Sequence, residues 1–157
     1  MFRLNRLTDY AVVVMAQLAL RDKATMAAGE LARDTGMPLP TVAKVLNALA
    51  RDGLIVSQRG AAGGYGLGRP ADEISVADVI QAIEGPIALT ACVDGAADSC
   101  GVEALCPMHG NWNKVNSAIH KALNSVSLAD MSSFPEPFGL PPGSEDGPRE
   151  AVPLSKV

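Results

Sequence analysis

The chain has 157 residues and a mass of 16.2 kDa, with 48% hydrophobic and 19% charged residues. This size excludes a barrel or a two-domain enzyme, and this composition excludes a chain that is disordered throughout. The longest apolar stretch, residues 11–20, is interrupted by Gln17 and is shorter than the roughly 18 to 20 residues that cross a bilayer. We therefore expect no transmembrane helix, no export signal and a cytoplasmic protein.

The net charge of −4 conceals an uneven distribution along the chain. Residues 1–70 carry nine Lys and Arg against five acidic residues, whereas residues 71–157 carry four against twelve. A basic half on an acidic protein is typical of phosphate binding by one face, because the attraction acts locally. A chance division of charge would give the same counts.

Apolar residues at helical spacing, bounded by capping and breaking residues, predict the elements of the first half. A mostly buried helix runs to Arg21 and is capped by Thr8 or Asp9. The elements after it are a helix over 27–35 that stops at Gly36, a turn over 37–40, a helix over 41–52 that stops at Gly53, and strands over 54–59 and 65–67 joined by a glycine turn. The core positions predicted here are Leu31, Val45, Leu46 and Leu49.

In the second half, Ser75 is predicted to cap a helix over 76–83 that ends at Gly85-Pro86. Residues 90–110 show little periodicity and are predicted to be a loop. From Asn111 to Met131 apolar residues recur every three or four positions, which predicts one helix of some twenty residues with one apolar face. The predicted divisions of the chain are 1–70 (DNA-binding domain), 71–110 (connecting helix and cysteine loop), 111–132 (long C-terminal helix) and 133–157, a disordered tail with six prolines and three glycines.

Two helices joined by a tight turn and followed by a two-stranded hairpin are the element order of a winged helix-turn-helix. The predicted fold is therefore mainly α, with a two-stranded wing and a long C-terminal helix. The residues predicted to contact DNA are Pro40, Thr41, Lys44, Asn47 and Arg51 in the reading helix and Arg59, Gly60, Gly63 and Tyr65 in the wing. Winged helices also serve as protein–protein modules, and the wing glycines can equally satisfy turn geometry alone.

The three cysteines stand at Cys92, Cys100 and Cys106, separated by seven and five residues, and His109 follows three residues after the last. The spacing contains no CxxC pair, which disfavours a structural zinc site. Three thiolates on a glycine-rich loop suit an iron–sulfur cluster whose remaining position is filled by imidazole or carboxylate. The alternatives are three small hydrophobic residues in a core, or a redox-reactive pair with a spare cysteine.

Several of these segments together resemble the Rrf2 family of bacterial transcription regulators, with its IscR-like and NsrR-like members. The resemblance runs from about Phe2 to Met131. It is carried by Leu7-Thr8-Asp9-Tyr10-Ala11, by the wing RGAAGGYGL over 59–67, by Ile74 to Ile83 and by the cysteine triplet. The opening, Leu4 to Ala19, is most similar to the subgroup that regulates the SUF iron–sulfur assembly operon.

The resemblance implies a homodimer, in which the helices over about 111–130 pack on each other, and a cluster held by the three cysteines. Family members often have five residues in the first gap, where this chain has seven. For the fourth ligand the family implies His109, as in its 2Fe-2S regulators, or Asp9 from the other subunit, as in its 4Fe-4S nitric-oxide sensors; we favour His109 and 2Fe-2S. Thr41 and Lys44 match base-contacting positions of the family, but Ala43 replaces a polar residue that some members use.

These inferences predict a dimeric, non-enzymatic regulator that binds a double-stranded DNA operator and represses iron–sulfur assembly genes according to its cluster status. We expect neither a membrane nor a small-molecule substrate among its partners. The alternatives are a nitric-oxide or redox sensor that uses the same cysteines, and a winged-helix protein with a structural zinc. A thiol redox enzyme would need a low-pKa cysteine with a resolving partner. The sequence supplies no nucleophile–base pair, which argues against an enzyme of any kind.

Overall fold

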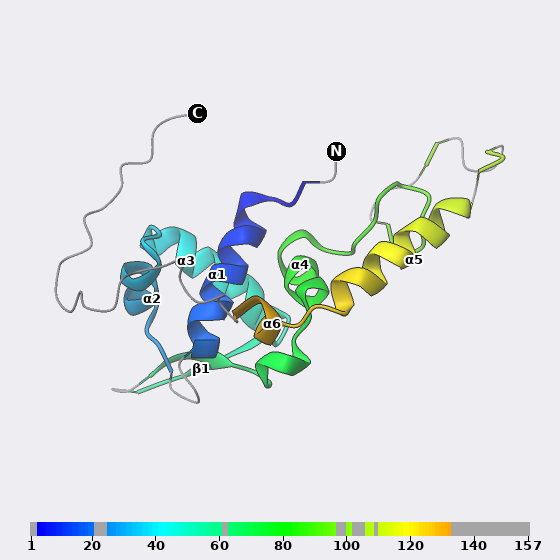
Figure 1. The fold of residues 1–157 in the computed structure, drawn as a ribbon. Helices are drawn as coiled ribbons and strands as arrows, with labels where there is room; N and C mark the ends of the chain where they lie inside the picture. The colour runs from blue at the N-terminus through cyan, green and yellow to red at the C-terminus, as the bar shows by residue number, and fades with distance from the viewer. Residues whose placement is uncertain are drawn as a thin grey trace, which may run out of the picture.

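The computed structural model describes residues 3–20, 25–60, 63–96, 100–101, 106–108 and 110–132. Figure 1 shows a body of packed helices with a small hairpin at its edge, and one helix projects from this body. The elements in chain order are α1 (Arg6–Leu20), α2 (Ala28–Thr35), α3 (Leu39–Arg51), β1 (Ile55–Gln58), β2 (Gly64–Leu67), the short 3₁₀ helix η1 (Ala71–Glu73), α4 (Val76–Glu84), α5 (Asn111–Asn124) and α6 (Leu128–Ser132). The predicted winged helix-turn-helix is confirmed.

The core lies where α1, α3 and α4 meet, with α1 passing through the middle of the body. The four predicted core residues, Leu31, Val45, Leu46 and Leu49, are all fully buried. Each such side chain contributes about 1.5 to 3 kcal/mol through its removal from water. The periodicity of α3 therefore fixes which face of that helix is left for solvent.

The start of α1 differs from the prediction. Asn5 caps the helix, because its side-chain oxygen accepts a hydrogen bond from Leu7 N at 3.0 Å. Thr8 and Asp9 both lie within the helix, so the prediction that either caps it is wrong. Thr8 is instead fully buried, and its hydroxyl donates to the Glu84 carboxylate at the end of α4. The threonine thus ties two helices together.

The helix-turn-helix is formed by α2 and α3. Gly36 ends α2 in the left-handed conformation at φ 70°, as its position predicted. The turn is shorter than predicted, because α3 begins at Leu39 and includes Pro40. A proline in the first turn is compatible with a helix, since the N–H that it lacks would have no partner there.

The wing is an antiparallel hairpin in which Ile55 pairs with Leu67 and Gln58 pairs with Gly64. The other edge of β2 is paired as well: Met26 N donates to Tyr65 O at 2.9 Å, and Tyr65 N donates to Met26 O at 2.8 Å. The segment before α2 thereby anchors the hairpin to the body.

The second half begins as predicted, with Ser75 capping α4. Its hydroxyl accepts from Asp78 N at 3.1 Å, and the Asp78 carboxylate accepts from Ser75 N at 2.9 Å. This reciprocal arrangement is a capping box.

The single helix predicted from Asn111 to Met131 is divided in two, with α5 ending at Asn124 and α6 beginning at Leu128. The break arises because the chain pairs with the segment before α4, where Leu128 N donates to Ile74 O at 2.7 Å. Leu128 is then buried in the core. No residue of α5 is buried, and the helix projects from the body (Figure 1).

Candidate nucleic-acid interface and cysteine site

The exposed face of α3 carries four of the nine residues predicted to contact DNA. The buried stripe of α3 occupies one side of the helix, and the opposite side carries Pro40, Lys44, Asn47 and Arg51. These four residues line one shallow groove together with Leu7 of α1 and Ile83 of α4. Thr41 is half-buried and does not line the groove.

The charge on this face is available to an external partner. Arg51 Nε lies 3.7 Å from Asp52 Oδ1, but both side chains are largely exposed, so the pair contributes little. Lys44 is also exposed on the same face. A helix that presents cations and an amide on its outer side fits the major groove, where such groups reach phosphates and base edges.

The wing supplies a second set of candidates at the end of β1. Arg59 and Gly60 are exposed, and Gly60 has φ 122°, a conformation that favours glycine. Gly63 serves a tight backbone approach, since a Cβ on it would lie 2.5 Å from Gln58 O. Residues 61 and 62 lie outside the described part of the chain.

Tyr65 differs from the other wing candidates in its environment. Its side chain is half-buried against the core, and its backbone holds Met26. The structure therefore gives Tyr65 an anchoring role in the hairpin. Sequence reasoning missed the partner residue Met26, because a single bridging residue carries no alternating pattern.

The three cysteines lie on the connection between α4 and α5. Cys92, Cys100 and Cys106 are free thiols, each half-buried. Thr90 Oγ1 lies 3.2 Å from Cys92 Sγ. Within the described ranges, no three His, Cys, Asp or Glu side chains are grouped closely enough to hold a metal ion. The predicted ligand His109 lies outside the described residues, as does the predicted tail over 133–157.

Asp9, the other predicted fourth ligand, is exposed on α1. It borders a groove formed with residues of α4 and with Met131 of α6. Asp9 lies on α1, whereas the three cysteines lie on the connection between α4 and α5. Among the described residues of this chain, Asp9 and the cysteines form no group of three side chains that could hold a metal ion.

Comparison with known proteins places this arrangement in a family. The family model Rrf2, described as an iron-dependent transcriptional regulator, matches residues 4–133. The chain belongs to the Rrf2 family. It is accordingly a DNA-binding transcriptional regulator and not an enzyme. Along the described residues, no helix has both the length and the apolar character needed to cross a membrane.

Individual relatives agree with this assignment. A Mycobacterium tuberculosis protein, named provisionally as an HTH-type transcriptional regulator, is 33% identical over 131 residues, which cover 83% of this chain and 81% of that protein. The transcriptional regulator IscR of Vibrio atlanticus is 32% identical over 123 residues, covering 78% of this chain and 70% of IscR. Among solved structures, CymR, the global cysteine regulator of B. subtilis, has a TM-score of 0.66 at 26% identity and covers 87% of this chain and 100% of CymR.

Proposed function

We propose that this Rrf2 regulator senses iron–sulfur status through a cluster on Cys92, Cys100 and Cys106 and represses cluster-assembly genes as a homodimer. The observation that carries the proposal is the position of three free, half-buried thiols on one short segment directly before α5. The description of the family as iron-dependent supports the same chemistry.

The donor set suits an iron–sulfur cluster. Cluster irons are held by thiolates, and three cysteines leave one position for a ligand of another type. His109 is the preferred candidate, which favours a 2Fe-2S cluster; Asp9 of a second subunit is the alternative and favours 4Fe-4S. When bound, the cluster would supply a group whose assembly and loss respond to iron, sulfide and oxidants. The three thiols would be drawn together only on binding, since the described residues do not form a preassembled metal site.

The dimer proposal rests on the surface of α5. Its apolar residues are left largely exposed by the rest of the chain, with Trp112 40% and Val115 44% accessible. An apolar face of this kind on a projecting helix is typical of an interface. Pairing of two α5 helices would set the distance between two α3 helices, and hence the spacing of the half-sites that they read.

On the DNA side, α3 would enter the major groove with Lys44, Asn47 and Arg51, while Arg59 approaches the backbone or minor groove from the wing. Thr41, half-buried in the first turn of α3, remains a candidate contact because it matches a base-contacting position of the family. Repression would follow when the operator overlaps a promoter, and the SUF-type assembly operon is the proposed target.

Anaerobic purification tests the cofactor. We expect a brown or reddish protein whose absorbance and electron paramagnetic resonance distinguish 2Fe-2S from 4Fe-4S, and we expect Cys92→Ser, Cys100→Ser and Cys106→Ser each to abolish the colour. Protein that stays colourless after reconstitution with iron and sulfide would refute the cluster. Tetrahedral zinc in that colourless protein would instead identify a structural zinc site.

A nitric-oxide or thiol-redox sensor is the second candidate, favoured by the accessibility of the thiols. Cys92, Cys100 and Cys106 are all partly exposed, as an oxidant-sensing thiol must be. A nitric-oxide sensor would carry the cluster and lose it on nitric-oxide treatment. A cluster-free thiol sensor would be colourless and would change its DNA affinity on oxidation.

A further inference from the structure

Asn116 binds the chain before Cys92 to α5. Its side-chain oxygen accepts from Leu89 N at 3.1 Å, and its Nδ2 donates to Ile87 O at 2.9 Å. The asparagine amide thus makes the two backbone hydrogen bonds that a neighbouring strand would make with residues 87 and 89. Both groups that it satisfies belong to the backbone of the loop.

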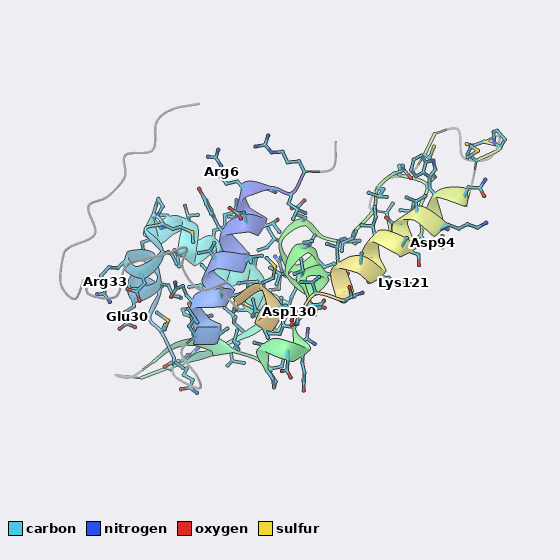
Figure 2. The ribbon with its side chains drawn as sticks, viewed as in Figure 1. Arg6, Glu30, Arg33, Asp94, Lys121 and Asp130 are labelled. Carbon is cyan, nitrogen blue, oxygen red and sulfur yellow. The ribbon has the colours of Figure 1, made fainter. Side chains whose placement is uncertain are left out.

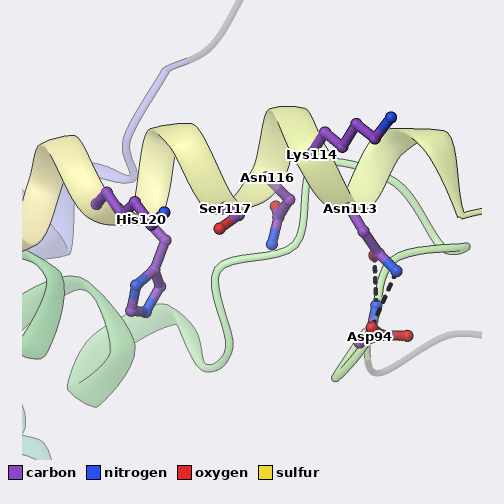
Figure 3. Close-up of a pocket in the computed structure, with 7 residues that line it drawn as sticks. Asp94, Asn113, Lys114, Asn116, Ser117 and His120 are labelled. Carbon is purple, nitrogen blue, oxygen red and sulfur yellow. Dashed lines mark hydrogen bonds between the residues drawn. The ribbon is translucent and has the colours of Figure 1, made fainter.

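Asn113, one turn earlier in α5, binds the chain on the other side of Cys92. Its side-chain oxygen accepts from Asp94 N at 3.0 Å, and its Nδ2 donates to the Asp94 carboxylate at 2.9 Å. Figure 3 shows these two bonds, with Asn113 and Asn116 directed from α5 toward the loop. Residues three apart on a helix share a face, so both amides meet the same segment.

We propose that Asn113 and Asn116 are positioning residues for Cys92, holding its segment on α5 from both sides. The proposal rests on the function proposed above, in which the three cysteines sense iron–sulfur status, and adds how one of them is held. Cys92 lies three residues after Leu89 and two before Asp94, beside the buried Val93. The Cys92 backbone is therefore fixed relative to α5 at both flanks, and displacement of its sulfur acts on α5.

The choice of residue supports a specific use of these amides. Asparagine is a poor helix former, so its presence twice within four positions of α5 weakens the helix unless the side chains find partners. α5 contains no buried residue, and these four hydrogen bonds are a principal connection between the helix and the loop. Each bond joins residues at least 19 positions apart.

The C-terminal end of α5 continues the connection toward the winged helix-turn-helix. Asn124 Oδ1 accepts from the Ser75 hydroxyl at 3.0 Å, and that hydroxyl caps α4. The Asp78 carboxylate of the same cap accepts from Arg69, just after the wing, at 2.7 Å. Hydrogen-bonded groups thus connect the Cys92 segment, through α5 and the cap of α4, to the base of the wing.

The test compares Asn113→Ala, Asn116→Ala and the double variant with wild type and with Ser117→Ala, an exposed control on the same helix. The first readout is the alkylation rate of each cysteine by iodoacetamide in reduced, metal-free protein, measured by peptide mass spectrometry. We expect Cys92 to react about tenfold faster in the double variant, as expected for the loss of several hydrogen bonds. Cys100 and Cys106 should be unchanged and serve as internal controls.

The second readout is hydrogen exchange of the Leu89 and Asp94 amides, which donate to the two asparagines. Each amide should exchange faster only in the variant that removes its own acceptor. Equal rates in the variants and in Ser117→Ala, for either readout, would overturn the proposal. So would a parallel rise at all three cysteines with a lowered melting temperature, because that pattern indicates general unfolding of the region.

A charge exchange separates positioning from simple packing. Asn113→Asp places a second carboxylate against Asp94 and should loosen the segment more than Asn113→Ala. Adding Asp94→Asn restores a donor and an acceptor with their positions reversed, and should return Cys92 alkylation to within about twofold of wild type. Failure of the double exchange to rescue would contradict the assignment.

These readouts are independent of the cofactor. If the wild type never takes up a cluster but the Cys92-specific changes are observed, the positioning role stands and the iron–sulfur function fails. If the wild type takes up a cluster but the variants match Ser117→Ala in both readouts, the positioning role fails alone.

Discussion

Replacing Lys44 by alanine should reduce both the DNA affinity and its dependence on salt. Lys44 lies on the outer face of α3, in the groove shared with Asn47 and Arg51. A protein that loses one phosphate contact releases fewer counterions on binding, and the slope of log K against log salt falls by about 0.9 per contact. A dimer carries two copies of α3, so the expected change in slope is about 1.8.

This slope has a measurable consequence across an ordinary salt range. Between 50 and 200 mM salt, the affinity deficit of the variant relative to wild type should shrink by about twelvefold. Fluorescence anisotropy with a duplex selected from a random library measures the affinity at each salt concentration. Arg51→Ala should behave similarly, because Arg51 lies on the same face.

Lys121→Ala is the matched control, since it removes the same charge from α5, away from α3 (Figure 2). It should leave the slope near that of wild type. A Lys44→Ala protein with an unchanged slope would refute the placement of α3 against DNA. An equal loss of slope in both variants would show that net charge, rather than the α3 face, determines the effect.

Three further predictions address the wing, the cap of α4 and acid stability. Gly63→Ala forces the wing tip to shift and should weaken DNA binding, measured by anisotropy. Gly29→Ala is the control, because its added methyl group meets open space in α2 and should leave the affinity unchanged. Equal affinities of the two variants would contradict the close backbone approach at Gly63. Ser75→Ala removes the cap of α4 and should lower the free energy of unfolding in urea by about 1 kcal/mol, while Ser117→Ala leaves it unchanged; a Ser75→Ala protein as stable as wild type would count against the cap. The backbone N–H of Ser127, and then its hydroxyl, hold the pKa of Asp130 below its ordinary value of 3.8. The ionised carboxylate therefore stabilises the folded state above that value, and this contribution is lost as pH falls through the lower folded pKa. Asp130→Asn should flatten the acid end of the curve of stability against pH, and a curve identical to that of wild type would exclude the contribution.

The winged helix-turn-helix and the start of α4 could be predicted from the sequence because their signals are local. Gly36 and Gly53 bracket a helix whose buried residues recur at helical spacing, and Ser75 stands three residues before Asp78 in a capping box. These patterns depend on neighbours within a few positions. The four core residues named from the pattern are all buried for the same reason.

The remaining differences arise from contacts between distant parts of the chain. The burial of Thr8 depends on Glu84, and the break after Asn124 depends on pairing with the segment before α4. Met26 joins the wing through a single bridge. Such contacts are set by tertiary packing, which overrides the local preference for one continuous helix.

The cysteine site was predictable in composition but not in arrangement. The sequence shows three thiols on one loop, yet the segment around Cys92 is placed by Asn113 and Asn116, which stand 21 and 24 positions later in the chain. No local pattern marks these asparagines as partners of the loop. On sequence alone they read as the polar face of an amphipathic helix.

Control of DNA binding by the cluster is tested by comparing the operator affinity of cluster-loaded and metal-free protein under anaerobic conditions. Anisotropy titrations at one fixed salt concentration, with the same selected duplex, give both dissociation constants. Control of DNA binding by the cluster predicts constants that differ by about tenfold or more, as allosteric coupling commonly gives, and predicts that Cys92→Ser abolishes the difference. Identical constants for the two forms of the wild-type protein would contradict sulfur-dependent control of DNA binding.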